Sequence, residues 1–246
     1  MSDSNKIKVI GTGGIGLCLL PTLCRYVNYS TELFPDPQVH LVDGDSFEEK
    51  NRARQGFSEY GNKASQTKAT LEAEFGRITF WDHPTYVDEA NIVRFIREGD
   101  IVLLCVDNHK TRKIVSDRAC ELENVTIING GNDTEDGNVM IHIRRGGKDI
   151  TPPLASRYHP EIVNPTDLHP SELANPGSCT RIAAEVPQVV IVNNLIAANM
   201  LSAFYCITKP EIYEGRVLKK PEAYGETLSD VRLLCTVSRD RFVEKK

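Results

Sequence analysis

Short apolar runs alternate with helix-like segments through the first half of the chain. Runs of mostly β-branched and aliphatic residues, typical of buried strands, occupy 7–11, 38–43, 78–81, 101–107 and 125–129. Between them, apolar residues at helical spacing predict helices over 15–27, 63–75, 88–96 and 111–123. Pro21 should kink the first helix or lie near its first turns. The alternation predicts an α/β fold, with a mostly parallel sheet covered by helices on both faces.

The pattern changes after Gly130. Residues 138–145 alternate apolar and polar side chains, which is typical of a half-exposed antiparallel strand. Residues 146–180 are rich in Pro, Gly, Asn and Ser without periodicity, and predict a long crossover loop. A long, mostly buried helix is expected over 185–207 and a final strand over 231–240. We therefore expect antiparallel strands to extend the sheet in the C-terminal part of the chain.

The composition is that of an ordinary globular protein, with 246 residues, 40% of them hydrophobic and 26% charged. The net charge of −5 argues against a nucleic-acid partner. Apolar runs fall short of the roughly 20 residues that a bilayer crossing needs, so no membrane association is expected. The chain starts without a charged-then-apolar leader, and a cytoplasmic location is the expectation.

Seven cysteines are present, at positions 18, 24, 105, 120, 179, 206 and 235. Their number is odd, and no two have the Cys-x-x-Cys spacing of a tetrathiolate zinc site. We expect reduced thiols and no structural zinc.

A glycine-rich turn, GTGGIG at 11–16, joins the first predicted strand to the first predicted helix. Gly11, Gly13 and Gly16 have the spacing of the dinucleotide fingerprint of Rossmann-like folds, and Gly14 lies within it. Such a turn lets a phosphate approach the backbone and the helix N-terminus. The alternative is a glycine turn that binds no ligand. The nucleotide stays open, since Asp43 lies further downstream than the acidic residue of NAD enzymes.

Polar residues lie near the carboxyl ends of the predicted strands, where open α/β sheets bind their ligands. The candidates are Asp43, Asp45, Asn51, Arg54, Gln55, Lys68, Asp107 and Asn108. Arg54 and Lys68 can neutralise phosphate oxygens, and Asp107 can hold Mg²⁺. Each residue alone is more often a surface or capping side chain. Together they favour a triphosphate.

This combination resembles the ThiF/MoeB/HesA family, the prokaryotic relatives of ubiquitin-activating enzymes. The matching elements are GTGGIG, D-x-D followed by N-x-x-R-Q at 43–55, the Gly-to-Lys-Ala segment ending at Lys68 and Ala69, V-D-N-x-x-x-R at 106–112, and a later helix, NNLIAANM at 193–200. The resemblance implies one adenylation domain over 1–246, with a nucleotide-binding half at 1–131 and a second half at 132–246. It further implies ATP and Mg²⁺ as cofactors, ribose contact by Asp43, phosphate contacts by Asn51, Arg54, Gln55 and Lys68, and Mg²⁺ contact by Asp107.

Three features depart from that family. Many members carry two Cys-x-x-Cys zinc pairs, which this sequence does not contain. Many have an N-terminal helix that lends an arginine to the partner subunit, whereas six residues precede the first predicted strand here. The phosphate lysine also has two candidates, because Lys63 lies five residues before Lys68. The sequence Gln-Thr-Lys-Ala favours Lys68.

Cys179 is the candidate nucleophile for a second step. Many activating enzymes pass the acyl group from AMP to a cysteine in the crossover loop. Cys179 lies in the polar segment NPGSCTR, with Arg181 two residues later as a cation that could lower the pKa of a thiol. The alternative is an incidental loop cysteine.

The leading hypothesis is adenylation of the C-terminal glycine of a ubiquitin-like or sulfur-carrier protein, with possible transfer through Cys179 to a conjugating enzyme. An NAD-dependent oxidoreductase would leave Arg54, Gln55 and Asp107 without a role. A catalytically inactive partner subunit would not require Arg54, Lys68 and Asp107. The resemblance also implies a homodimer.

Overall fold

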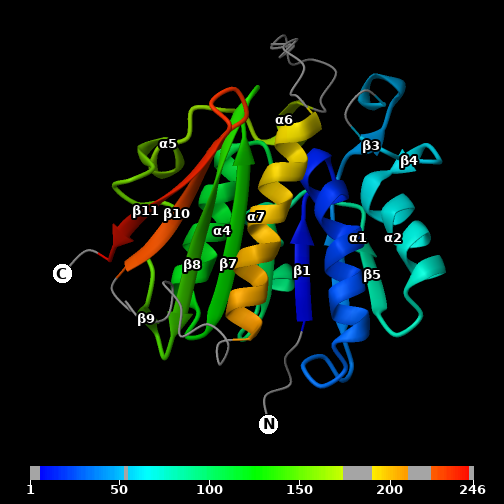
Figure 1. The fold of residues 1–246 in the computed structure, drawn as a ribbon, viewed down its shortest axis with the longest axis horizontal. Helices are drawn as coiled ribbons and strands as arrows, with labels where there is room; N and C mark the ends of the chain where they lie inside the picture. The colour runs from blue at the N-terminus through cyan, green and yellow to red at the C-terminus, as the bar shows by residue number, and fades with distance from the viewer. Residues whose placement is uncertain (1–5, 53–54, 174–189, 210–222, 244–246) are drawn as a thin grey trace.

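The computed structural model describes residues 6–52, 55–173, 190–209 and 223–243. One mixed sheet runs through the molecule (Figure 1). In spatial order its strands are β11 (Cys235–Phe242), β10 (Ala223–Asp230), β8 (Asp136–Arg145), β7 (Val125–Asn132), β6 (Ile101–Leu104), β1 (Lys6–Ile10), β2 (Gln38–Val42) and β5 (Thr79–His83). The strands from β7 to β5 pair in parallel, and β8, β10 and β11 extend them in antiparallel fashion. This arrangement confirms the predicted α/β fold.

Helices cover both faces of the sheet (Figure 1). One face carries α1 (Gly14–Tyr29), α2 (Lys63–Glu74) and α7 (Val190–Thr208), and the other carries α3 (Ile92–Phe95), α4 (His109–Glu121) and α5 (Pro160–Val163). The strand β1 shows why two cores form. Its buried residues Ile7 and Val9 join the core under α1 and α7, whereas Ile10 joins the core under α4.

Besides a 3-10 helix (Glu49–Asn51), four short elements complete the described chain. They are β3 (Ser46–Phe47), β4 (Gly61–Asn62), β9 (Lys148–Asp149) and α6 (Pro170–Leu173). The strands β3 and β4 pair with each other after β2, and β9 pairs with β8.

The long helix α7 was expected to be mostly buried, but it buries only one face. Its buried residues are Val192, Asn193, Ile196, Ala197, Met200 and Phe204. By length and composition α7 could cross a membrane, with a mean hydropathy of 1.6. Its inner face packs on α1 and β7, which is how a core helix packs.

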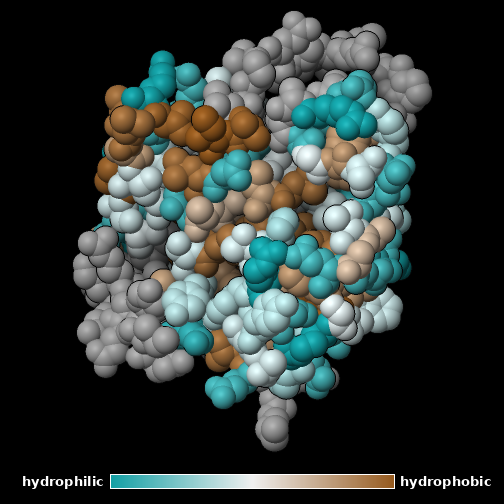
Figure 2. Space-filling view, turned by 45° about the vertical axis from the view of Figure 1, so that its right-hand side comes forward, coloured by the Kyte–Doolittle hydropathy of each residue, from teal (hydrophilic) through white to brown (hydrophobic). Residues whose placement is uncertain are grey.

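The C-terminal segment differs from its prediction. A single strand was expected over 231–240, but the chain forms the hairpin β10–β11 with its turn at 231–234. The apolar residues Leu233 and Leu234, which suggested a strand, lie in that turn and are 71% and 92% exposed. The space-filling view shows hydrophobic residues gathered at the upper left, on the side that carries the hairpin and the start of α7 (Figure 2).

Two further predictions need correction. The helix expected over 88–96 is the single turn α3, and the described part of the expected loop 146–180 contains β9, α5 and α6. Cys120, which lies in the helix predicted over 111–123, is exposed. Pro21 lies inside α1, on its exposed side.

Candidate functional site

A cavity of about 250 Å³ opens at the carboxyl ends of β1, β2 and β6. We call it the glycine cleft, because Gly11, Gly13 and Gly14 line it. The chain runs from β1 through β2 to β5 on one side, then continues with β6 and β7 on the other. The cleft therefore lies at the topological switch point, where open α/β sheets bind ligands.

The turn after β1 is shaped by close backbone packing. Gly11 has φ +91°, and a Cβ there would lie 2.7 Å from the carbonyl oxygen of Cys105 in the segment after β6. The helix α1 begins at Gly14 without a side-chain cap or an acidic residue in its first turn. Its first N–H groups and its positive dipole end are thus available to an anion. Gly16 is buried in α1 against Gly11, and does not line the cleft.

Asp43 ties the end of β2 to the glycine turn. Its carboxylate accepts hydrogen bonds from the backbone N–H of Thr12 at 2.7 Å, from the Thr12 hydroxyl at 3.1 Å and from the N–H of Asp45 at 2.9 Å. Burial raises the pKa of Asp43, while Lys63 and the backbone donors act in the opposite direction. Asp43 lines the cleft, and also holds the glycine turn in place.

Lys63 is the lysine of the cleft. Its side chain is 9% exposed, and its Nζ lies 3.1 Å from Oδ2 of Asp45. The backbone N–H of Lys63 donates to the Asp45 carbonyl at 2.8 Å, which fixes the start of α2 beside the cleft. The hydroxyl of Tyr86 donates to Oδ1 of Asp45. Asp45 therefore holds Lys63 in a position to meet a phosphate.

The structure does not bring Lys68 to the cleft. Its Nζ pairs with Asp82 at 3.2 Å and with Glu72 at 3.7 Å, and Lys68 is not among the residues that line the cavity. Lys63 and Lys68 are five residues apart on α2, which places them about 140° apart around the helix axis. Of the two candidate lysines that the sequence offers, the structure therefore places Lys63, and not the favoured Lys68, in the cleft.

Four other predicted residues line the cleft: Asn51, Gln55, Asp107 and Asn108. Asn51 ends a short 3-10 helix (Glu49–Asn51), and its Oδ1 accepts from the Glu48 N–H at 2.9 Å. Gln55 is buried, and its Oε1 has no hydrogen-bond partner among the described residues. Asn108 caps α4 by accepting from the Thr111 N–H at 2.8 Å. The other predicted site residues, Arg54 and Cys179, lie outside the described residues.

A second cavity, of about 630 Å³, lies between α5 and the antiparallel strands β8, β10 and β11. We call it the side cavity. Asp107 and Asn132 line both the side cavity and the glycine cleft, so the two spaces adjoin. The side cavity could therefore bring a second reactant to a ligand in the cleft.

Arg112 provides a buried positive charge in the wall of the side cavity. It is 7% exposed, and burial lowers its pKa, an effect opposed first by Asp107. Its Nη2 donates to the Val106 carbonyl at 2.8 Å, whereas its Nε has no hydrogen-bond partner within the described chain. A buried guanidinium with an unused donor favours an anionic ligand.

Sequence reasoning missed Tyr86, Asn132 and Asn193, which also line the glycine cleft. One signal was available. Asn193 is a polar residue inside a long apolar pattern, and a buried amide needs a hydrogen-bond partner.

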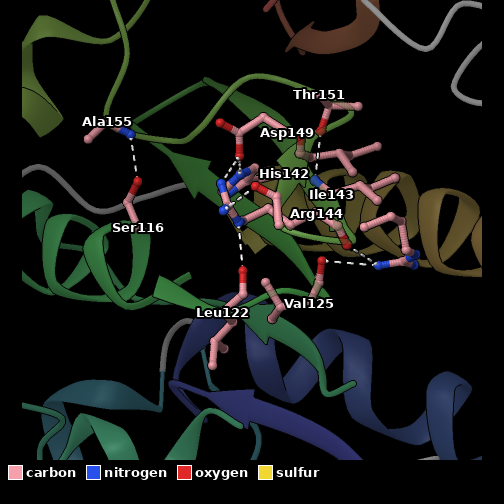
Figure 3. Close-up of polar contacts among 12 residues, drawn as sticks. Ser116, Leu122, Val125, His142, Ile143, Arg144, Asp149, Thr151 and Ala155 are labelled. Atoms are coloured by element: carbon pink, nitrogen blue, oxygen red, sulfur yellow. Dashed lines mark hydrogen bonds and ion pairs between the residues drawn. The ribbon is translucent and has the colours of Figure 1, made fainter. Parts of the chain in front are cut away.

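Potential metal ligands also meet away from the cleft. Donor atoms of Cys120, His142 and Asp149 all lie within 4.8 Å of one another. The close-up shows Asp149 between His142 and Arg144, with Nε2 of His142 at 2.9 Å and Nη1 of Arg144 at 2.6 Å from its Oδ1 (Figure 3). Arg144 also donates to the Leu122 carbonyl at 2.8 Å. This network ties β8 and β9 to the residue that follows α4, and it explains why His142 and Asp149 lie together.

Comparison with known proteins identifies the family. A model of the ThiF family matches residues 2–219. This chain belongs to the ThiF family. A search of curated proteins found no match. Among solved structures, Escherichia coli MccB with ATP has a TM-score of 0.69 at 17% identity, covering 97% of this chain and 64% of that one.

Two further structures share the fold of this ThiF family member. The microcin C7 biosynthetic enzyme MccB in complex with N-formylated MccA has a TM-score of 0.69 at 17% identity, covering 96% of this chain and 64% of that one. PaaA has a TM-score of 0.59 at 15% identity, covering 98% and 64%. This chain thus spans about 64% of the length of these relatives.

Proposed function

We propose that this ThiF family member uses ATP to adenylate the C-terminal carboxylate of a peptide or small carrier protein. The observation that carries the proposal is the meeting of two cavities. The glycine cleft offers a helix N-terminus and Lys63 to phosphates, and the adjoining side cavity offers Arg112 to a carboxylate. The structures of MccB with ATP and with N-formylated MccA support a nucleotide and a second reactant in this fold.

The reaction requires the C-terminal carboxylate of the acyl substrate to lie next to the α-phosphate of ATP. A carboxylate oxygen of the acyl substrate attacks the α-phosphorus of ATP, the bond to the β-phosphate breaks, and pyrophosphate leaves. Arg112 would hold the incoming carboxylate by charge and hydrogen bonding. Lys63 and the first N–H groups of α1 would neutralise the phosphates, and Asp43 would accept from the ribose hydroxyls. Most of the catalysis would come from this positioning and from electrostatic stabilisation.

The donor set fits magnesium. Asp107 is an exposed carboxylate on the border between the two cavities, and Mg²⁺ prefers carboxylate and water oxygens. Three other carboxylates line the glycine cleft, and each already has partners. Asp45 is engaged by Lys63 and Tyr86. Asp43 accepts from Thr12, and Glu48 accepts from the backbone N–H of Asn51. We therefore assign Mg²⁺ to Asp107. The ion would neutralise phosphate charge and orient the leaving group.

The finer steps remain part of the proposal. Cys179 would accept the acyl group from AMP as a thioester and pass it to a conjugating partner. The enzyme would work in the cytoplasm as a homodimer, for which the exposed face of α7, including Ile191, offers apolar surface.

ATP–pyrophosphate exchange tests the central step. Candidate substrates are small proteins or peptides encoded beside this gene, especially any that end in Gly-Gly. Exchange should require ATP, Mg²⁺ and a free C-terminal carboxylate. The same peptide with an amidated C-terminus is the matched control, and should give no exchange. Tight binding of NAD together with indifference to ATP would refute the proposal in favour of an oxidoreductase.

A further inference from the structure

Two asparagines lie where the glycine cleft meets the side cavity. Asn132, the last residue of β7, lines both spaces, and Asn193 of α7 lines the glycine cleft. The Nδ2 of Asn132 donates a hydrogen bond of 2.7 Å to the Oδ1 of Asn193. This bond fixes the orientation of the Asn193 amide, because its oxygen is held by Asn132.

The amide nitrogen of Asn193 is a buried donor with no hydrogen-bond partner among the described residues. Asn193 is 1% exposed, so water does not satisfy this donor readily. An unsatisfied buried donor costs about 1–3 kcal/mol. Such a donor on the wall of a ligand cleft indicates that a ligand completes its hydrogen bonding.

The position of this nitrogen identifies the ligand group. A Cβ on Gly14 would lie 2.6 Å from Nδ2 of Asn193, so the nitrogen lies against the first residue of α1. The first N–H groups of α1 are available at the same place to bind an anion. The Asn193 amide therefore adds a side-chain donor to a phosphate site made of backbone donors.

We propose that Nδ2 of Asn193 donates a hydrogen bond to the α-phosphoryl group of the nucleotide, and that Asn132 positions it. This inference rests on the proposed adenylation, in which the α-phosphorus must lie where the carboxylate enters. Asn132 marks that place, since it borders both cavities. A donor fixed in advance stabilises the negative charge on the α-phosphoryl oxygens during attack. Asn193 is then a catalytic residue, and Asn132 a positioning residue.

The test compares adenosine with AMP, because the two differ only in the α-phosphate. Affinities are measured by calorimetry for the wild-type protein and for Asn193→Leu and Asn193→Asp. Asn193→Leu should weaken AMP binding about 10–100-fold, the usual contribution of a hydrogen bond to a charged group, and leave the affinity for adenosine unchanged. Asn193→Asp keeps the shape but replaces the donor with a carboxylate, and should weaken AMP further.

Two variants serve as comparisons. Asn194 is the next residue on α7, is exposed, and bonds only to the Val190 carbonyl among the described residues. Asn194→Asp should leave both affinities within about two-fold of the wild type, since exposed substitutions perturb little. Asn132→Leu should reduce the affinity for AMP less than Asn193→Leu does. In the double variant, Asn132→Leu should add little to the loss caused by Asn193→Leu, because both substitutions act through one hydrogen bond.

The outcomes separate the two proposals. If the wild type binds ATP and folded Asn193→Leu or Asn193→Asp keeps the wild-type preference for AMP over adenosine, the role of Asn193 is refuted and the adenylation proposal stands. If the wild type binds neither ATP nor AMP, the proposed function is refuted and this inference with it. Circular dichroism melting establishes folding, and Asn193→Asp, which preserves the side-chain shape, serves if Asn193→Leu does not fold.

Discussion

Replacing Glu226 with Gln removes a buried charge that joins three parts of the C-terminal half. The carboxylate of Glu226 is 1% exposed and accepts from Asn138 of β8 at 2.8 Å and from Arg241 of β11 at 2.7 Å. Nε2 of His159, just before α5, lies 3.1 Å from it. Glu226→Gln keeps the shape of the side chain, and so isolates the contribution of the charge.

The pKa of Glu226 gives the magnitude. Burial raises it, but His159, Asn138 and Arg241 outweigh burial and lower it from 4.5 to about 2. A shift of this size corresponds to about 3 kcal/mol, which partial solvent screening reduces to about 2 kcal/mol. This stabilisation is present above the unfolded pKa of 4.5, and is lost as the pH falls toward about 2.

His159 sets the upper limit of the pH window. Burial lowers its pKa, but Glu226 and Glu161 outweigh burial and raise it above 6.5. A raised folded-state pKa stabilises the fold below the unfolded value, and that contribution is lost as the pH rises through the folded value. The loss of unfolding free energy caused by Glu226→Gln should therefore be largest at about pH 5.5 and smaller at about pH 9. The contribution of His159 is lost as the pH rises through its raised pKa, while Arg241 still pairs with Glu226.

Urea denaturation followed by circular dichroism at these two pH values measures the loss. Glu172→Gln is the matched control, because Glu172 is an exposed carboxylate paired with Lys110, and exposed ion pairs contribute little to stability. Two results would refute the reasoning: an equal cost of Glu226→Gln at both pH values, or a cost no larger than that of Glu172→Gln.

Three other sets of substitutions test the glycine cleft and the side cavity. Lys63→Met should weaken ATP binding about 10–100-fold in calorimetry, whereas Lys68→Met should leave the affinity near the wild-type value. A larger loss of affinity in Lys68→Met than in Lys63→Met would identify Lys68 as the phosphate lysine. Gly14→Ala should lower stability by about 1–3 kcal/mol through contact with Asn193, and adding Asn193→Ala should restore the melting temperature but not AMP affinity. Arg112→Met should leave ATP binding unchanged and reduce substrate-dependent pyrophosphate exchange about 100-fold; equal losses in both assays would contradict a role at the carboxylate.

The parallel half of the fold could be predicted because most of its strands are rich in buried apolar residues, although β1 also contains the buried Lys8. Buried strands such as β1 and β6 need apolar residues on both faces, and their alternation with helical segments indicated a parallel sheet. The hairpin β10–β11 could not be predicted in this way. Its strand β10 reads AYGETLSD, and its described buried residues include Glu226 and Ser229, whose burial depends on partners distant in sequence.

The gathering of strand ends into one cleft also followed from the sequence. Carboxyl ends of neighbouring parallel strands meet at one edge, so Asp43 and Asp107 were expected together, and both line the glycine cleft. The choice between Lys63 and Lys68 required the rotational phase of α2. That phase is set by where the helix begins, and the Asn62 cap and the contact of Lys63 with Asp45 determine it.

The asparagine pair shows what a motif comparison leaves out. Asn132 and Asn193 lie 61 residues apart, and they meet only because α7 crosses β7. The other buried positions listed for α7 carry apolar side chains, and the pattern predicts another one at position 193. Asn193 is buried there instead, and its Nδ2 donor has no hydrogen-bond partner among the described residues. Buried amides usually have both of their ends bonded within the fold. Asn132 satisfies the Oδ1 of Asn193 and leaves its Nδ2 facing Gly14. A phosphate bound at the start of α1 would supply the acceptor that this Nδ2 lacks, which accounts for an asparagine at this buried position.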